Sequence, residues 1–500
     1  MNEDLVILDE PLIEFNHGQQ LADPHIGLSL FGPYDVGDPA QPRRMSYALI
    51  GTDKALSKFH LWSEEVMTGK VVSFEKDRNL WPMFPGFEVA MHCEWPIVPS
   101  KEISIDENTV LYHSNLNDPH QRTSRVVSDY VDELAKLNLR DEHYGVVICI
   151  IPDEVWRNCR PRSVPIKGFG YRTSNTERKM RILGQRSILR DDWDPEEYQY
   201  SLDFRRQIKA RSLQFDMPIQ IIRESTLTIG PLDETTKRKL TPISDRAWNL
   251  STTLYYKGGG KPWRLAGARE GVCYIGISFK KTEIGEKSTT ACCAAQMFLD
   301  SGDGVVFLGD KGPWYSPENK QFHLTHEAAG DLLTGVLKKY NDLEGKELKE
   351  IFLHSRSEIS SDEFEGYKSA CPPNVVLVGI RVRPDNNIRL YRRGDFPVLR
   401  GTFWKLSSRE AYLWTTGFKA DLRTYDGSQV PAPLHITLMY GNEDLEQISR
   451  DIFGLTKLNY NSCKIGTFNP VTILFSDSVG EILISNPKVK NPSPKFKFYI

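Results

Sequence analysis

One apolar run dominates the middle of the chain: Val146-Val147-Ile148-Cys149-Ile150-Ile151, directly followed by Pro152-Asp153. Six consecutive apolar residues that stop at a proline are typical of a β-strand buried on both faces. Strands of this kind occur where helices cover both sides of a parallel sheet. The run therefore predicts an α/β domain around it.

A second strand and a connecting helix extend this prediction. A basic, irregular stretch covers Arg160–Arg190, and a helix is expected over about 195–215 because a proline starts it and apolar residues follow at helical spacing. Pro218–Ile222 is again apolar. Strand, crossover and strand predict a Rossmann-like parallel sheet within residues 101–260.

The glycine-rich cluster Lys257–Trp263 is the best candidate for a domain boundary. Beyond it, residues 261–500 are expected to form a second, mixed α/β domain with one helix over 325–340. Residues 1–100, which are rich in turn formers, are expected to supply short strands and loops that wrap both lobes. The strands expected in the second half are Gly271–Phe279, Val305–Leu308, Glu350–His354, Val375–Val382, Ala411–Phe418, Leu434–Tyr440 and Val471–Phe475.

Composition restricts the class of protein. The 500 residues carry 63 basic and 66 acidic side chains, a net charge of −3, so a polyanion would have to bind in a local groove. The eight cysteines form no C-x-x-C pair, which disfavours a zinc ribbon or a thioredoxin-like site. The first residues do not resemble a signal peptide, and no apolar stretch approaches a membrane span. We expect a cytoplasmic protein without a membrane segment.

Four polar residues form a candidate anion site. Arg205 and Lys209 are four apart on the predicted helix, Gln220 lies in the next strand, and Lys257 starts the glycine-rich cluster. All four can donate hydrogen bonds, and charge-assisted bonds to a phosphate each contribute roughly 1.5–3 kcal/mol. Taken singly, Arg205 and Lys209 are better explained as a solvated helix face and Lys257 as part of a flexible turn; only the four residues as a set favour an anion site.

A family resemblance supports the anion site. The segments Lys209-Ala210-Arg211, Pro218-Ile219-Gln220 and Lys257–Trp263 closely resemble the MID domain of Argonautes. The resemblance implies that Arg205, Lys209, Gln220 and Lys257 bind the 5′-phosphate of a guide strand. It also implies that Mg²⁺ binds there to the C-terminal carboxylate of Ile500, which requires that the apolar tail is packed; the alternative is a tail whose carboxylate lies in water.

The second half resembles a PIWI domain. Leu455–Asn461, Pro470-Val471-Thr472 and Phe475-Ser476-Asp477 match the signature near the end of that domain. Together with the MID-like run, the resemblance covers about 300 residues. The elements Leu30–Pro33 and Pro82–Phe87 are similar to the short prokaryotic branch, in which N and PAZ domains are lacking. The implied fold is two-lobed α/β: a Rossmann-like MID domain and an RNase H-like PIWI domain.

The resemblance also implies which positions would carry a nuclease centre. An RNase H-like nuclease holds two Mg²⁺ ions with about four acidic or histidine ligands. Ser278 and Arg356 stand where acids are expected, and only Asp477 is acidic. Asp300 and Asp303 are the alternative ligands, although their surroundings favour a hairpin turn. We therefore expect no catalytic residues and no nuclease activity in this chain.

Inactive short Argonautes resemble the sensing half of a defence system. The implied partners are a guide RNA, an invading single-stranded target DNA, and a separate APAZ-containing effector that is TIR-like or sirtuin-like and degrades NAD, less commonly a nuclease. Activation is expected to involve oligomerisation. Two alternatives remain open: a guide-dependent nuclease that cuts its own target, and a silencing protein that works without an effector.

Overall fold

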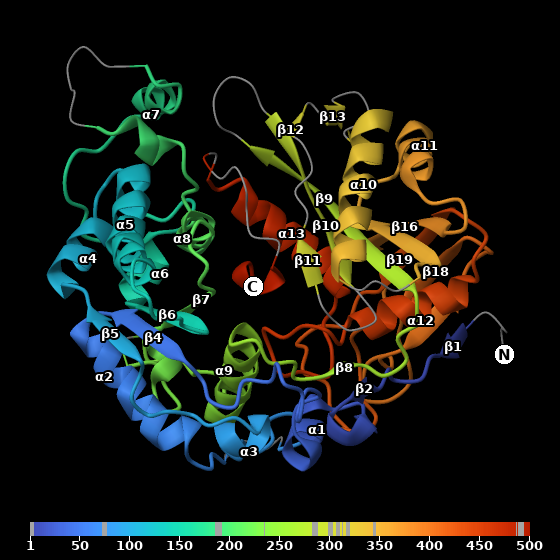
Figure 1. The fold of residues 1–500 in the computed structure, drawn as a ribbon, viewed down its shortest axis with the longest axis horizontal. Coiled ribbons are helices and arrows are strands. Elements are labelled where there is room, and N and C mark those ends of the chain that lie inside the picture. The colour runs from blue at the N-terminus through green and yellow to red at the C-terminus, as the bar shows by residue number, and fades with distance from the viewer. Residues whose placement is uncertain are drawn as a thin grey trace.

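The chain folds into two lobes joined at one side, as the computed structural model shows (Figure 1). The structure describes residues 5–72, 78–185, 193–234, 236–282, 289–298, 304–306, 311–312, 314–316, 321–343, 347–486, 488 and 495–500. Its mixed α/β architecture agrees with the fold class expected from the sequence.

The first lobe contains a four-stranded parallel sheet in the order β5 (Lys101–Ser104), β4 (Tyr47–Gly51), β6 (Val146–Ile151) and β7 (Ile219–Arg223). All six residues of β6 are buried. The two strands predicted from apolar runs, their order along the chain and their parallel pairing are thus confirmed.

The sheet also contains a strand that the sequence did not predict. Strand β4 lies next to β6 in the centre of the sheet, and all five of its residues are buried. It leads into the ten-residue helix α2 (Asp53–Trp62), which is capped by Thr52. The expectation that residues 1–100 form only short strands and loops around the lobes is wrong here, and the sheet extends across residue 100. The error arose because one short apolar strand has little periodicity to detect.

Helices surround this sheet on both faces. The single helix expected over 195–215 is divided into η3 (Pro195–Tyr198) and α8 (Phe204–Ser212), because the Asp203 side chain accepts a hydrogen bond from the Arg206 backbone and starts α8 anew. The remaining helices of this lobe are α4 (Glu107–Ser114), α5 (Pro119–Asn138), α6 (Asp153–Asn158), α7 (Asn175–Ile182) and η4 (Glu224–Leu227).

The second lobe contains a ten-stranded mixed sheet, with nine strands in the order β1-β17-β18-β19-β16-β15-β9-β10-β11 and β12 paired to β10. Strands β9, β15 and β16 are parallel neighbours, and the others pair antiparallel. The bounds are β1 (Leu5–Ile7), β9 (Val272–Thr282), β10 (Thr289–Phe298), β11 (Gly304–Val306), β12 (Lys311–Gly312), β15 (Glu350–Ser355), β16 (Val376–Pro384), β17 (Thr402–Lys405), β18 (Glu410–Leu413) and β19 (Leu434–Tyr440).

Residues alternate between the two faces of this sheet. In β9, Cys273, Ile275 and Ile277 pack with α10 (His326–Leu343) and α11 (Ser361–Ala370). On the other face, Tyr274 packs in the core that includes α12 (Leu445–Leu455) and α13 (Val471–Leu483). The predicted strand Val471–Phe475 is wrong, since it is the first part of α13. This helix is buried between β9, β10 and α8, so it is apolar on several sides and resembles a buried strand in sequence.

Helix α13 approaches β9 unusually closely. A Cβ atom on Gly276 would lie 1.9 Å from the main-chain oxygen of Thr472, so only glycine allows this contact. Beside it, His354 of β15 hydrogen-bonds to the Thr472 hydroxyl at 2.9 Å. These contacts place the first turn of α13 directly against the middle of β9.

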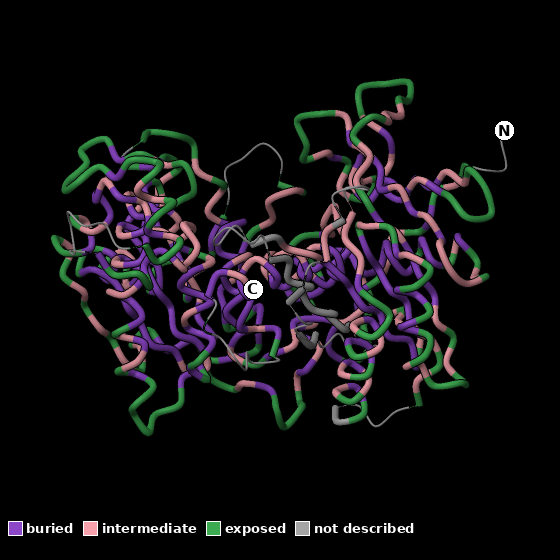
Figure 2. Tube along the Cα trace, turned by 90° about the horizontal axis from the view of Figure 1, so that it is seen from above, coloured by how far each residue is buried: buried purple, intermediate pink, exposed green. Residues whose placement is uncertain are grey.

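The two lobes share one hydrophobic core along their common side. Helix α9 (Ile243–Lys257), η5 (Phe496–Phe498) and the first seventy residues contribute to it. The C-terminal residues lie in the interior between the lobes, whereas the N-terminus lies at the periphery (Figure 2). Smaller elements complete the fold: β2 (Ile13–Glu14), η1 (Asn16–Gly18), β3 (Gln20–Leu21), α1 (Pro24–Phe31), η2 (Ser63–Met67), α3 (Phe87–Met91), β8 (Arg264–Leu265), β13 (Tyr315–Ser316) and β14 (Gln321–Phe322).

Among the described helices, none has both the length and the apolar character that crossing a membrane would require.

Candidate functional site

The four residues predicted to bind a phosphate come from three adjacent elements of the first lobe. Arg205 and Lys209 lie one turn apart on α8, and Gln220 lies on β7. Lys257 is the last residue of α9, not part of the glycine-rich turn as expected. The helix fixes the backbone orientation of Lys257, whereas an irregular turn would not.

The two lysines converge on the end of the chain. The Lys257 ammonium donates hydrogen bonds to the main-chain oxygens of Ile219 and Ile500, both at 2.6 Å. The Lys209 ammonium donates to the main-chain oxygen of Tyr499 at 3.0 Å and also to that of Ile500. Ile500 is itself 3% exposed, so the expectation of a packed tail is confirmed.

Burial makes this arrangement electrostatically unusual. Lys209 is 2% exposed and Lys257 is fully buried. Burial, together with the positive charges of Lys257 and Arg205, holds the pKa of Lys209 well below its ordinary value. Burial and then the nearby Arg205 lower the pKa of Lys257 to about 7. A cluster of cations that repel one another out of water gains strongly from a bound anion.

Next to these cations lies a cavity of about 370 Å³ between α8, β7 and α9. Arg205 and Gln220 line it, and so does Asn249, whose side-chain oxygen also accepts a hydrogen bond from the Cys463 backbone. A neighbouring cavity of about 340 Å³ lies between α6, α8 and α13 and shares Trp156 and Arg205 with the first. The structure thus brings Arg205 and Gln220 to a cavity wall, with Lys209 and Lys257 buried behind it.

The tryptophan between the cavities was missed in the sequence. Trp156 lies on α6, with the Arg160 guanidinium 3.9 Å and the Arg223 guanidinium 5.2 Å from its ring centroid. Trp156 and Arg160 lie four residues apart in the sequence, and this spacing could have indicated their contact. Arg223 comes from a different strand, so its approach could not be predicted from spacing.

The surroundings of Ile500 do not fit the expected magnesium ion. Mg²⁺ requires a near-octahedral set of oxygen ligands, often carboxylates and waters. Here two lysine ammonium groups already donate to the Ile500 oxygen, and positive groups repel a divalent cation. We therefore derive no step that uses a metal at this position.

The three positions at which the sequence resemblance places a nuclease centre also lie together, beside the middle of α13. Ser278 on β9 donates a hydrogen bond to the Ser476 main-chain oxygen at 2.9 Å. Arg356, which follows β15, is ion-paired through Nη2 with Asp477 Oδ2 at 3.0 Å. The second oxygen of Asp477 is 3.0 Å from the Lys280 ammonium. Both carboxylate oxygens of Asp477 are therefore neutralised by cations of the chain.

Lys280 was not recognised from the sequence. It lies two residues after Ser278 on the same face of β9, so strand periodicity would have placed it there. Its ammonium is also 3.7 Å from Glu481, which pairs with Arg206 of α8 at 2.8 Å. A row of alternating charges thus connects the Asp477 position with the helix that carries Arg205.

Of three further potential metal ligands, His354, Asp300 and Asp303, the described residues include only His354. His354 is buried against Thr472, and burial lowers its pKa to about 3, so it packs as a neutral side chain. Asp300 and Asp303 lie outside the described residues. In the part of the chain that the structure describes, no three histidine, cysteine or acidic side chains are grouped so that they could hold a metal ion.

Comparisons with known proteins agree on one fold. No family model matches the chain. A 240-residue segment, 47% of this chain and 31% of the relative, is 24% identical to the protein argonaute of Aquifex aeolicus. The structure superposes on Clostridium butyricum Argonaute bound to a guide DNA and a target DNA with a TM-score of 0.63 and 15% identity, over 99% of this chain and 54% of that one.

Two more solved structures give the same result. Aquifex aeolicus Argonaute with externally bound siRNA matches with a TM-score of 0.57 and 15% identity, and Drosophila Piwi with 0.56 and 14%. Each match covers 99% of this chain and 56% of the other. The chain thus spans about half the length of the Argonautes that it superposes on. Its fold is that of the MID and PIWI lobes of Argonaute proteins.

Proposed function

We propose that the chain is a member of the Argonaute family that binds the 5′-phosphorylated end of a guide strand and presents the guide for pairing with a target. The observation that carries this proposal is the cation cluster at the first cavity. Lys209 and Lys257 are buried side by side, and Arg205 and Gln220 line the wall in front of them. A terminal phosphate supplies the negative charge that this cluster lacks.

We propose a role for each of the four residues. Arg205 and Gln220 contact the phosphate oxygens directly, because their side chains reach the cavity. Lys209 and Lys257 stabilise the negative charge from behind and hold the C-terminal segment in place. Target specificity then comes from base pairing, while the protein contacts the backbone of the strands.

The experiment that tests the proposal compares two guides on the purified chain. A 5′-phosphorylated RNA should bind much more tightly than the same RNA with a 5′-hydroxyl, and the preference should disappear in Arg205→Ala. Equal binding of both guides by the unaltered chain would contradict the pocket assignment. The same comparison with DNA guides decides the expected preference for RNA.

We further propose that the chain does not cut the target. The support is the pairing of Asp477: one of its carboxylate oxygens is ion-paired with Arg356 and the other with Lys280. The competing proposal, a guide-dependent nuclease, is tested by incubating guide-loaded protein with a labelled complementary DNA and Mg²⁺ or Mn²⁺. Cleavage that disappears in Asp477→Ala would establish the nuclease and reject our proposal.

A recognition protein without its own chemistry needs another protein to act. We propose an APAZ-containing effector, TIR-like or sirtuin-like, that degrades NAD in the cytoplasm once an invading single-stranded DNA has paired with the guide, with oligomerisation during activation. This part rests on the resemblance to short prokaryotic Argonautes. Affinity purification from the native host tests it: a stable complex that degrades NAD only with guide and target supports the proposal, whereas a chain that purifies alone supports a silencing protein.

A further inference from the structure

A basic and aromatic surface lies outside the proposed guide pocket, on a stretch of chain whose residues Arg160 and Pro161 line the second cavity. It comprises Arg157, Arg162, Val164, Ile166, Lys167, Phe169, Tyr171, Arg172 and, from α4, Tyr112, and we call it the flank surface; all nine are exposed. Among the described residues, none of its four cations has a carboxylate within ion-pair distance. Unpaired cations grouped on one stretch favour a polyanionic ligand.

The flank surface also presents flat rings and apolar side chains to solvent. Tyr112 is 50% and Phe169 47% exposed, and their rings stack with centroids 5.8 Å apart and an angle of 26°. Ile166 is 93% exposed. Exposed aromatic rings among cations are the combination that binds single-stranded nucleic acids, because bases stack on the rings while phosphates meet the cations.

This surface is held rigidly although it has little regular structure. The guanidinium of Arg122, 1% exposed, donates hydrogen bonds to the main-chain oxygens of Leu116, Asn158 and Ser163 at 2.7–2.9 Å. The Phe169 backbone bonds to Asn115 and Asn117, both at 2.8 Å. Burying an arginine costs free energy. The three hydrogen bonds of Arg122 offset this cost and hold the main chain of this stretch in one conformation.

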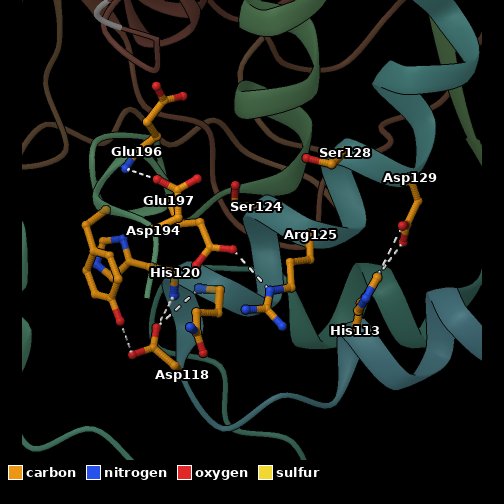
Figure 3. Close-up of polar contacts among 12 residues, drawn as sticks. His113, Asp118, His120, Ser124, Arg125, Ser128, Asp129, Asp194, Glu196 and Glu197 are labelled. Carbon is orange, nitrogen blue, oxygen red and sulfur yellow. Dashed lines mark hydrogen bonds and ion pairs between the residues drawn. The ribbon is translucent and has the colours of Figure 1, made fainter. Parts of the chain in front are cut away.

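Two further contacts fix the elements beneath it. His113, next to Tyr112, pairs with Asp129 of α5 at 2.9 Å and ties α4 to α5 (Figure 3). Asp118 at the start of α5 accepts hydrogen bonds from the Thr173 hydroxyl and, at 2.7 Å, from Tyr198. The flank surface is thus anchored at residues 163, 169 and 173, and it meets a ligand with little loss of conformational entropy.

The position of the surface identifies the strand that it would meet. Arg160 lies in the sequence between Arg157 and Arg162 of the flank surface, and it lines the second cavity. This cavity shares Trp156 and Arg205 with the proposed phosphate pocket. Paired strands are antiparallel, so the target continues past the 5′ end of the guide as a single-stranded 3′ segment. That segment leaves the duplex next to Arg205.

We propose that the flank surface binds the single-stranded 3′ flank of the target, beyond the last base paired with the guide. The inference rests on the proposed guide pocket. Stacking on Tyr112 and Phe169 gives the contact its preference for unpaired bases, and Lys167 and Arg172 bind the backbone. An anionic membrane is the competing ligand, but the stretch lacks the amphipathic helix that lies in a membrane surface.

The experiment uses the full chain loaded with a 5′-phosphorylated guide and two complementary DNAs. One target ends opposite the guide 5′ base, and the other continues with a single-stranded 3′ extension. We expect the extension to tighten binding by about tenfold, the effect of one or two stacked bases. Equal affinity for the two targets at low salt would overturn the proposal.

Variants separate this surface from the guide pocket. Tyr112→Ala with Phe169→Ala should abolish the advantage of the extended target while leaving guide retention and the blunt target unchanged. Tyr391→Ala, at an aromatic residue 74% exposed on the other lobe, is the matched control and should keep the advantage. Lost guide retention in the unaltered chain would instead reject the guide pocket, so the two failures are distinguishable.

A charge variant and a lipid control complete the test. Lys167→Glu with Arg172→Glu should weaken binding of the extended target and reduce its salt dependence, because phosphate contacts are lost. Vesicles containing phosphatidylserine are the lipid probe. Vesicle binding that depends on Phe169 and Lys167, without any advantage of the extended target, would assign the surface to a membrane and overturn the proposal.

Discussion

Two groups of charged residues, one behind the first cavity and one around Asp477 of α13, differ in how their charge is balanced. At the first cavity, Lys209 and Lys257 are buried with main-chain oxygens as their partners. At the Asp477 position, Arg356 and Lys280 neutralise the carboxylate directly. A site whose charge is left unbalanced attracts a ligand, whereas a site balanced by its own side chains has little to gain from one.

The proposed function, recognition without cutting, rests on this difference. A nuclease centre depends on concentrated negative charge, and a single cation inside it removes that property. The proposed phosphate pocket depends on positive charge, which Arg205 supplies and which a bound anion favours on the two buried lysines. Five predictions test this difference, beginning with the largest expected effect.

Reversing the exposed charge of the pocket should have the largest effect. Arg205→Glu replaces an attraction to the guide phosphate by a repulsion, and we expect guide affinity to fall by about 100-fold, since the lost charge-assisted bond contributes roughly 1.5–3 kcal/mol, or about 10- to 150-fold. Arg205 suits this test better than Lys209, whose substitution would also release the C-terminal segment. The readout is guide binding together with the melting temperature.

The matched control for this prediction is Arg450→Glu. Arg450 lies on α12 and forms a surface ion pair with Glu446 at 2.8 Å. It should keep normal guide affinity. Equal losses in both variants would mean that net charge, and not the pocket, governs binding.

The pH dependence of guide binding should show the next effect. Because the pKa of Lys257 is lowered to about 7, the lysine loses its proton above this pH in the guide-free protein. The guide phosphate favours the protonated form, so affinity should fall as pH rises above 7, by at most about tenfold per pH unit for one lysine. Binding measured at constant ionic strength checks this.

The same lysine predicts the opposite trend for stability. Between its folded pKa of about 7 and its ordinary value near 10.5, the unfolded chain binds a proton that the folded chain has lost. The free energy of unfolding of the guide-free protein should therefore rise with pH in this window. Lys257→Met should flatten both profiles, and unchanged profiles in that variant would exclude Lys257 as their source.

Removing the balanced carboxylate should have a smaller effect. Asp477→Asn leaves Arg356 and Lys280 without their shared partner, and we expect the free energy of unfolding to fall by about 1 kcal/mol, because the pairs are partly exposed. Chemical denaturation measures this change. Guide affinity should stay the same, and a loss comparable to that of Arg205→Glu would show that the two sites are not separate.

The smallest effect concerns the charge row between the sites. Arg206→Gln breaks the pair with Glu481 and should cost about 0.5 kcal/mol or less, because both side chains are substantially exposed. In a double-mutant cycle with Arg356→Gln, the two losses should add within about 0.5 kcal/mol. A larger coupling energy would mean that the row transmits changes between the two sites.

Much of the fold was predictable from local patterns, but its centre was not. The apolar runs at Val146–Ile151 and Pro218–Ile222 gave two adjacent parallel strands, which the structure confirms. Strand β4 was missed although it lies between β5 and β6. Residues Val471–Phe475 were assigned to the wrong element because a helix buried on several sides has no polar stripe.

The amino-acid sequence by itself determined the types of residue available at each site: hydrogen-bond donors at 205, 209, 220 and 257, and Ser278, Arg356 and Asp477 at the positions that the resemblance assigns to a nuclease centre. Only the tertiary structure decided how these charges are balanced. It buried two lysines behind the cavity wall and placed Lys280 on the free oxygen of Asp477. The physical reason is that electrostatic energy depends on distance and burial, which residues far apart in the sequence acquire only when the chain folds.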